Sequence, residues 1–428
     1  MNQALFSFIK HVPTAYHAAA HTAELLQNAG FTLLSEADEW KLENGKGYYV
    51  LRNGSSLIAF RMKSEFSGFM MTAAHGDSPA FKIKENAEME DANYLRLSTE
   101  KYGGMLCSSW MDRPLSIAGR VTVRSNEGFA VRLVDLEGVS AIIPNVAIHM
   151  NRNANENASY NASVDMLPLY GMKSDAGTLK KRIAEHLGVN ETDILTTDLF
   201  LYNPQEGVCF NRLIAAPRLD DLQCAFAAMT AFLQAKDGKG LPIYCLFDNE
   251  EVGSQTKQGA ASTFLRDVLF RISHAANLDG EAMQCKFADS FLVSCDNAHA
   301  VHPNHAEYKD PNHTAVLNGG IVLKYNANQR YTSDAVSAGL FRLICEKAQV
   351  PLQYYANRAD MPGGSTLGNI ADTQVSVNTV DIGLPQLAMH SAMETAGAED
   401  TEYMVRVLER FYQTSISLQK DGSYFIAD

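Results

Sequence analysis

Residues 67–77 read Ser-Gly-Phe-Met-Met-Thr-Ala-Ala-His-Gly-Asp. The apolar run before His75 is short and continuous, which is typical of a strand buried on both faces of a sheet. Two further runs, at 242–247 and 290–295, end just before the acidic residues Asp248 and Asp296. In open α/β sheets the binding crevice lies beyond the carboxyl ends of the strands. The sequence therefore predicts an α/β fold with a functional site where these strands end.

Helical patterns accompany these runs. Residues 14–30 begin with Thr14, a typical N-cap, continue with Ala and Leu, and end at Gly30, a typical helix stop. A second pattern follows Asp220, where apolar residues recur at helical spacing through residue 233. We expect a helix in each place, with Asp220 at the N-terminus of the second.

The pattern changes between about residues 81 and 200. Segments 120–124 and 129–133 alternate with a period of two around a Ser-Asn-Glu-Gly turn, which indicates antiparallel strands. A short helix is expected from about Thr178, a candidate N-cap, to Leu187. The sequence thus predicts a separate, mainly β module at 81–200, inserted into one discontinuous domain formed by residues 1–80 and 201–428.

Composition excludes several classes of partner. The chain has 428 residues, of which 46% are hydrophobic, enough to bury a large core. Its 36 basic and 49 acidic residues give a net charge of −13, whereas nucleic acids and anionic membranes attract basic surfaces. No apolar stretch approaches the ~20 residues that span a bilayer, and the N-terminus lacks the basic start of a secretory signal. We expect no nucleic-acid partner, no membrane partner and a cytoplasmic location.

The seven cysteines are scattered and mostly flanked by apolar residues. This distribution is typical of buried free thiols in a reducing compartment. Since no Cys-x-x-Cys pair occurs, the cysteines do not indicate a structural zinc site.

The residues expected near the strand ends have the chemistry of metal ligands. Two histidines and three carboxylates suit a two-metal site in which one carboxylate bridges the ions, and Asp220 is the natural bridge. Without cations, so many carboxylates in one cleft would repel one another strongly. The predicted ligands are His75, Asp220, Glu251, Asp296 and His390.

Two neighbouring residues have different expected roles. Asp77 follows His75 by two positions and could orient its imidazole. Of the adjacent Glu250 and Glu251, one can bind a metal while the other takes a proton from metal-bound water. We assign Glu250 as the general base. A lone His or a Glu-Glu pair is usually structural. The prediction therefore depends on finding potential ligands at the ends of several strands at once.

Longer motifs resemble a known family. The chain reads Asp-Asn-Glu-Glu-Val-Gly-Ser at 248–254 and Ala-His-Ala-Val-His-Pro-Asn at 298–304, with matching motifs at 74–79, 217–220 and 387–391. These motifs, in this order, resemble the aspartyl aminopeptidases, the M18 family of metallo-aminopeptidases. The resemblance implies a zinc-exopeptidase-like mixed sheet flanked by helices. It also implies a dizinc enzyme that removes N-terminal residues, typically Asp or Glu, from peptides.

The resemblance also implies how the metals are held. Two positions would share Asp220, and Glu250 would act as the base. One metal would be bound by His75, Asp220 and Asp296, and the other by Asp220, Glu251 and His390. Zinc is the implied metal, although cobalt and manganese tolerate the same ligands.

Further residues acquire roles from the same resemblance. Lys324 would pair with the acidic side chain of the substrate, Tyr331 lies in the same motif, and His299 is close enough in sequence to Asp296 to contact substrate. His149 would reach into the active site of a neighbouring subunit. The module at 81–200 would be a dimerisation domain, and the dimers would assemble into a tetrahedral dodecamer. The glycine-containing loop at 361–366 lacks a phosphate-loop ending and would border the substrate.

Other functions remain open at this point. The same ligands would serve an aminopeptidase with a neutral, Leu-like preference, or another zinc exopeptidase or deacylase such as a carboxypeptidase. A peptide-binding scaffold without catalysis is a third alternative, which the complete set of ligands and base opposes. Four histidines between His299 and His313 suggest a surface or site-lining loop rather than a further metal site, because turn motifs separate them.

Overall fold

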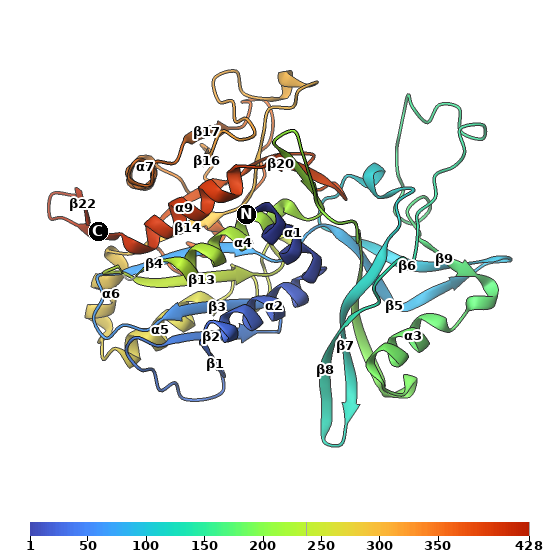
Figure 1. Ribbon diagram of the computed structural model, residues 1–428, viewed down its shortest axis with the longest axis horizontal. Coiled ribbons are helices and arrows are strands. Elements are labelled where there is room, and N and C mark those ends of the chain that lie inside the picture. Colours follow the sequence, from blue (N-terminus) through green and yellow to red (C-terminus); the bar gives the residue numbers. More distant parts are fainter. Residues whose placement is uncertain (237, 428) are drawn as a thin grey trace.

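The computed structural model describes residues 1–236 and 238–427. Its centre is a nine-stranded mixed sheet (Figure 1). In spatial order its strands are β1 (Thr32–Leu34), β2 (Gly47–Arg52), β3 (Ser56–Arg61), β13 (Leu241–Phe247), β4 (Phe69–His75), β14 (Phe291–Cys295), β18 (Asn378–Gly383), β16 (Ile321–Tyr325) and β17 (Leu352–Ala356). The three apolar runs are β4, β13 and β14, each buried along its whole length, as predicted. Strand β4 pairs in parallel with both of the others.

Helices cover both faces of this sheet. Alternate side chains of β4 point to opposite faces, so that Met70 and Ala74 join one core while Met71 and Ala73 join the other. The first core contains residues of α1 (Asn2–His11), α2 (Ala15–Asn28), α4 (Leu219–Gln234), α7 (Ala335–Ala348) and α9 (Asp400–Gln413). The second contacts α5 (Phe264–Ala275), α6 (Gly280–Ala288) and α8 (Gly368–Ala371). The predicted α/β class and the two predicted helices are confirmed.

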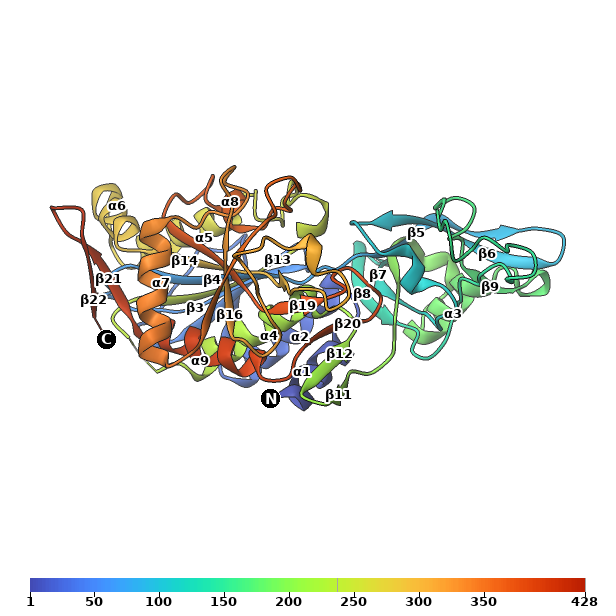
Figure 2. The ribbon, with the colours of Figure 1, turned by 90° about the horizontal axis from the view of Figure 1, so that it is seen from above.

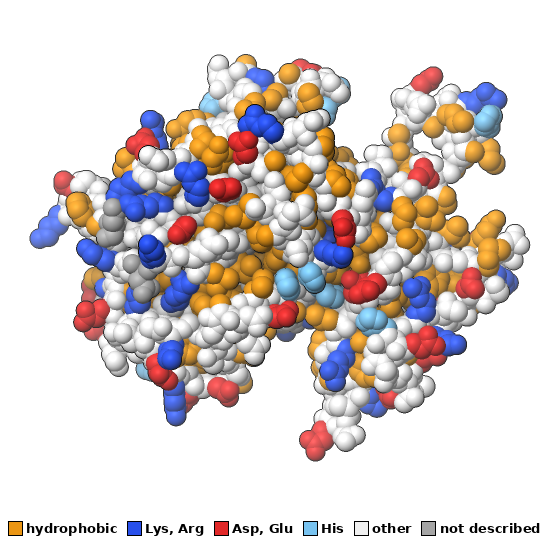
Figure 3. All heavy atoms as spheres, viewed as in Figure 1, with side chains coloured by type: hydrophobic (Ala, Val, Ile, Leu, Met, Phe, Trp, Pro, Cys, Tyr) orange, Lys and Arg blue, Asp and Glu red, His pale blue; other side chains and the backbone are white. Residues whose placement is uncertain are grey.

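A second, antiparallel sheet stands beside the first. Its strands, in spatial order, are β8 (Gly128–Asp135), β7 (Ser116–Ser125), β10 (Ile194–Tyr202), β5 (Ala80–Glu90), β6 (Tyr94–Tyr102) and β9 (Leu169–Met172). With α3 (Thr178–Leu187) it encloses a core of its own. We call this part the inserted module; Figures 2 and 3 show it as a lobe beside the main sheet.

Local details of the inserted module follow the sequence, with one correction. Arg124 pairs with Phe129 across the predicted hairpin turn. Helix α3 covers the predicted span, but Gly177 rather than Thr178 is its N-cap. The φ of Gly177 is +82°, a backbone conformation that glycine adopts without strain, and Thr178 is therefore the first residue of the helix rather than its cap.

The remaining strands are short. One five-stranded sheet contains β11 (Val208–Phe210), β12 (Leu213–Ala216), β20 (Glu394–Gly397), β19 (Pro385–Leu387) and β15 (Ala298–His299), and a hairpin joins β21 (Ser415–Leu418) to β22 (Tyr424–Ala427).

The cysteine prediction was only partly right, because Cys209 and Cys285 are exposed while four others are buried. Within the described chain, no helix is both long and apolar enough to cross a membrane.

Candidate metal centre

Five predicted ligands come together beyond the strand ends. His75 is the last residue of β4, Asp296 follows β14, and Asp220 lies in the first turn of α4, where the backbone is not yet helical. Glu251 lies in a 3₁₀ turn after β13, and His390 in the loop after β19. Because β4, β13 and β14 are parallel neighbours, their carboxyl ends share one edge of the sheet.

The ligand atoms form three overlapping groups, one of which combines His75 and Glu251 with the predicted base Glu250. His75, Asp220 and Asp296 each offer one atom within 4.8 Å of the others, and so do Asp220, Glu251 and His390. His75 Nε2 lies 3.5 Å from Asp220 Oδ1, and His390 Nε2 lies 3.3 Å from Asp220 Oδ2. The two oxygens of Asp220 therefore face different histidines, the arrangement that a bridging carboxylate requires.

The donor set fits divalent cations. Within residues 1–236 and 238–427, the buried atoms Asp220 Oδ1 and Glu251 Oε1 have no hydrogen-bond partner. An unsatisfied buried carboxylate oxygen is costly unless a cation or donor faces it. Burial raises the pKa of Asp296 to about 6 and that of Glu251 well above its ordinary value. Nitrogen and oxygen ligands of this kind suit zinc.

Asp77 organises the same edge. Its carboxylate accepts hydrogen bonds from the backbone N–H groups of Glu250 and Glu251, both at 3.2 Å, and lies 3.4 Å from Nδ1 of His75. It also accepts a 2.7 Å hydrogen bond from the hydroxyl of Tyr102 on β6. Asp77 thus fixes the orientation of His75 and of the Glu250–Glu251 turn together.

Glu250 belongs to the group with His75 and Glu251 but to neither of the two groups that share Asp220. Its Oε2 lies 4.0 Å from His75 Nε2, and burial raises its pKa to about 8. A carboxylate whose pKa lies near neutral pH can both accept and return a proton.

A pocket of about 190 Å³ opens onto the metal ligands. Lys324, Tyr331, His299 and Tyr355 line it, together with residues 364–366. The ammonium group of Lys324 donates to the carbonyl of Asn297 at 3.2 Å and lies 3.8 Å from Asp296 Oδ2. Burial opposes this charge, yet Asp296 holds the pKa of Lys324 above its ordinary value. The pocket therefore presents a buried cation beside the ligand groups.

The structure gathers every predicted site residue except His149. His149 is exposed in the long loop between β8 and β9, which Figure 1 shows extending away from the main sheet. The histidines from His299 to His313 line a neighbouring cavity of about 250 Å³. His305 pairs with Glu307 at 3.0 Å and His313 with Asp310 at 2.8 Å. Within the described residues, all groups with metal-ligand geometry belong to the centre above.

Sequence reasoning missed two residues of the centre. Buried Glu394 accepts hydrogen bonds from the backbone N–H groups of His390, at 2.7 Å, and Asp220, at 3.0 Å. Its position four residues after His390 was the available signal. Tyr102 had none, because it reaches Asp77 from the inserted module.

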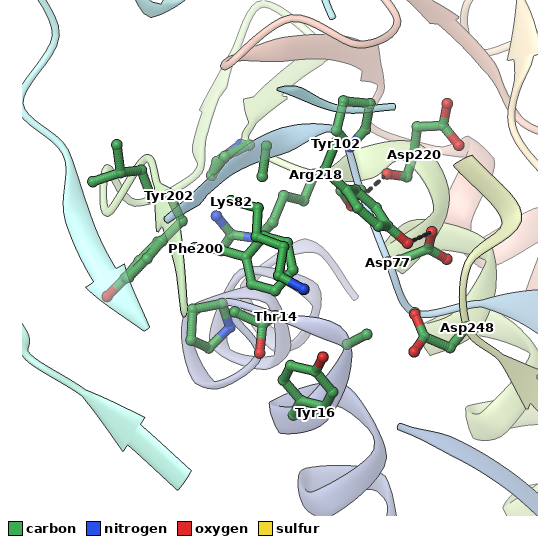
Figure 4. A pocket seen from close by; sticks show the side chains of 18 of the residues that line it. Thr14, Tyr16, Asp77, Lys82, Tyr102, Phe200, Tyr202, Arg218, Asp220 and Asp248 are labelled. Carbon is green, nitrogen blue, oxygen red and sulfur yellow. Dashed lines mark hydrogen bonds between the residues drawn. The ribbon is translucent and has the colours of Figure 1, made fainter. Parts of the chain in front are cut away.

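Figure 4 shows the setting of Tyr102. A cavity of about 280 Å³ between the inserted module and the main sheet is lined by residues that include Tyr16, Lys82, Phe200 and Arg218. Tyr102 and Asp77 lie on one wall, with their hydrogen bond drawn as a dashed line. Through Tyr102 the inserted module therefore contacts Asp77, next to the metal ligands.

Known proteins resemble this chain in sequence and in fold. The family model described as Aminopeptidase I zinc metalloprotease (M18) matches residues 8–412. The probable M18 family aminopeptidase 2 of Clostridium novyi is 42% identical over 421 residues, which cover 95% of this chain and 97% of that protein. Among solved structures, the cryo-EM structure of the Ape4 and Nbr1 complex matches with a TM-score of 0.92 at 34% identity, covering 96% of this chain and 85% of that chain. The structure of the S. cerevisiae mApe1 dodecamer matches with a TM-score of 0.84 at 28% identity, covering 96% of this chain and 96% of that chain.

Proposed function

Because this chain belongs to the M18 family of zinc metalloproteases and is a metallo-aminopeptidase, we propose that it uses two zinc ions and prefers peptides that begin with Asp or Glu. The observation that carries the two-metal proposal is the pair of ligand groups sharing Asp220, whose two oxygens face His75 and His390. Cobalt or manganese would satisfy the same donors.

The proposed ligands are His75, Asp220 and Asp296 for one ion, and Asp220, Glu251 and His390 for the other. Divalent ions bound there supply Lewis-acid chemistry, which acidifies a water molecule and polarises the scissile carbonyl. Glu250 takes the proton of the attacking water on its carboxylate and returns it to the departing amine. Its buried position favours the protonated form between these two events. Asp77 keeps His75 and the Glu250 turn in place throughout.

We assign the acidic preference to Lys324. A carboxylate entering the pocket would meet its ammonium group where water is largely excluded, and such a charge-assisted contact discriminates strongly against neutral side chains. Tyr331, whose ring centroid lies 5.2 Å from Lys324 Nζ, and His299 would form the pocket walls.

We propose that residues 81–200 form a dimerisation domain and that dimers build a tetrahedral dodecamer. The mApe1 structure, which is a dodecamer, supports this assembly. The loop that carries His149 also exposes Ile148 and Met150, the latter at 83%, and exposed apolar side chains suit an interface. In the assembly His149 would stabilise the oxyanion in a neighbouring subunit.

The test is a comparison of initial hydrolysis rates on matched peptides that begin with Asp, Glu, Leu or Lys. Zinc-loaded protein should cleave the Asp and Glu peptides fastest, and Glu250→Gln should lose at least ~100-fold in kcat. Acetylating the N-terminus should abolish cleavage, which separates an aminopeptidase from a carboxypeptidase. Preference for Leu would remove the role of Lys324 but keep the two-metal mechanism, and full activity in Glu250→Gln would refute the base assignment.

A further inference from the structure

Two loops form one side of the pocket beside Lys324. The first runs from 326 to 334, between β16 and α7, and carries Tyr331. The second runs from 357 to 367, between β17 and α8, and lines the pocket with residues 364–366. The position of each loop decides the width of the pocket, so whatever fixes the two loops to each other also fixes the space for a side chain.

A single buried carboxylate joins these loops. Asp381 lies in β18 and is fully buried. Its Oδ2 accepts hydrogen bonds from the backbone N–H of Thr332, at 2.6 Å, and from the Thr332 hydroxyl, at 2.8 Å. Its Oδ1 accepts a 2.6 Å hydrogen bond from the hydroxyl of Thr366. Each oxygen of one carboxylate therefore holds a different loop.

The surrounding contacts leave this carboxylate little freedom. The hydroxyl of Ser333 accepts a hydrogen bond from the N–H of Asp381 at 3.0 Å, which anchors the first loop a second time. On the other side a Cβ at Gly368 would lie only 2.6 Å from Asp381 Oδ1, so the start of α8 packs directly on the carboxylate. A buried carboxylate is stable only when donors satisfy it, and here these donors come from the two loops.

We propose that Asp381 is a positioning residue that sets the selectivity of the pocket by holding these two loops at a fixed separation. The inference rests on the proposed function only in taking this pocket as the one that receives the N-terminal side chain of the substrate. Asp381 acts through Thr332 and Thr366 and does not itself touch substrate. Loss of the Asp381 carboxylate should weaken substrate binding and the discrimination between N-terminal side chains, rather than slow the chemical step.

The experiment compares isosteric variants of Thr366 in the zinc-loaded full-length protein. Thr366→Val removes the hydroxyl and keeps the volume, so it should raise KM for the preferred peptide by ~10-fold and reduce the preferred-to-disfavoured ratio of kcat/KM by a similar factor, with kcat changed less than two-fold. Thr366→Ser keeps the hydroxyl and should restore both values. Thr379→Val is the control, because Thr379 is buried on the same strand as Asp381 and its hydroxyl donates to the Val377 carbonyl.

A double-mutant cycle separates positioning from direct contact with substrate. Asp381→Ala should reproduce the change in KM and selectivity, and adding Thr366→Val to it should cause little further loss, since both variants break the hydrogen bond between Asp381 and Thr366. Additive losses in the double variant would overturn the proposal. An unchanged selectivity ratio in the single variant Thr366→Val, which keeps Asp381, would overturn it as well. Should Asp381→Ala fail to fold, the comparison of Thr366→Val with Thr366→Ser still decides.

The outcome is distinguishable from failure of the proposed acidic preference. If the wild-type protein prefers Leu peptides, the role of Lys324 fails, but Thr366→Val should still reduce the Leu-to-Asp ratio. If the wild-type preference is acidic and the Thr366→Val ratio is unchanged, only the Asp381 proposal fails.

Discussion

Replacing Tyr102 with Phe tests whether the inserted module supports the metal centre. The change removes a hydroxyl that donates to Asp77 at 2.7 Å and accepts from the Asn249 amide at 2.9 Å. A hydrogen bond to a charged group contributes ~1.5–3 kcal/mol, equivalent to a factor of ~10–100. Asp77 would keep its two longer bonds, both at 3.2 Å, to the N–H groups of Glu250 and Glu251. We therefore expect zinc affinity and kcat to fall ~10-fold or more.

Zinc affinity is measured by competition with a chromophoric chelator, and kcat with saturating peptide and metal. The matched control is Tyr202→Phe, because Tyr202 donates a comparable 2.8 Å hydrogen bond to Asp135, away from the metal ligands. The control should leave both quantities within two-fold of wild type. If Tyr102→Phe does the same, Asp77 does not need the inserted module, and the reasoning is refuted.

Three further predictions concern stability. Phe232→Ala should cost ~3–5 kcal/mol in urea unfolding, because Phe232 is fully buried and its ring packs on Tyr412; a loss below 1 kcal/mol would contradict the packing. Burial lowers the pKa of His17 from 6.5 to about 4. Below pH 6.5 the unfolded chain therefore binds a proton at His17 that the folded chain does not bind. The stability that neutral His17 contributes is complete above pH 6.5 and is lost as the pH falls towards 4. The decline in unfolding free energy over that interval should be shallower in His17→Gln, and identical slopes would contradict it. Chelation should lower Tm, since a metal that binds only the folded state stabilises it, and zinc should restore Tm; a Tm insensitive to chelator would contradict the metal centre.

The parts of the fold that sequence could predict are those governed by local patterns. Continuous apolar runs identified β4, β13 and β14, and the parallel pairing of such strands explains why His75, Glu250 and Asp296 were expected at one edge. This inference needs no side-chain detail, because strand direction alone brings the ends together. Strand direction does not account for Asp220, at the start of α4, or for His390, which follows β19.

Residues that act across elements could not be predicted in this way. Tyr102 reaches Asp77 from another sheet, and Asp381 joins two loops from β18, a strand that follows both loops in sequence. Neither residue has a neighbour in sequence that reveals its partner, since the contact exists only once the sheets have packed. The role of His149 stays a prediction for a related reason, because it depends on a second subunit.

Asp296 links the two functions that the pocket would combine. Its carboxylate lies within reach of His75 and Asp220 on one side and 3.8 Å from the Lys324 ammonium on the other. As a metal ligand, Asp296 would share its negative charge between zinc and Lys324, which would leave the ammonium group less fully compensated. A carboxylate on the substrate would complete that compensation, whereas a neutral side chain would leave a buried cation short of a partner. Metal binding and acidic selectivity would thus reinforce each other, because both draw on the same carboxylate.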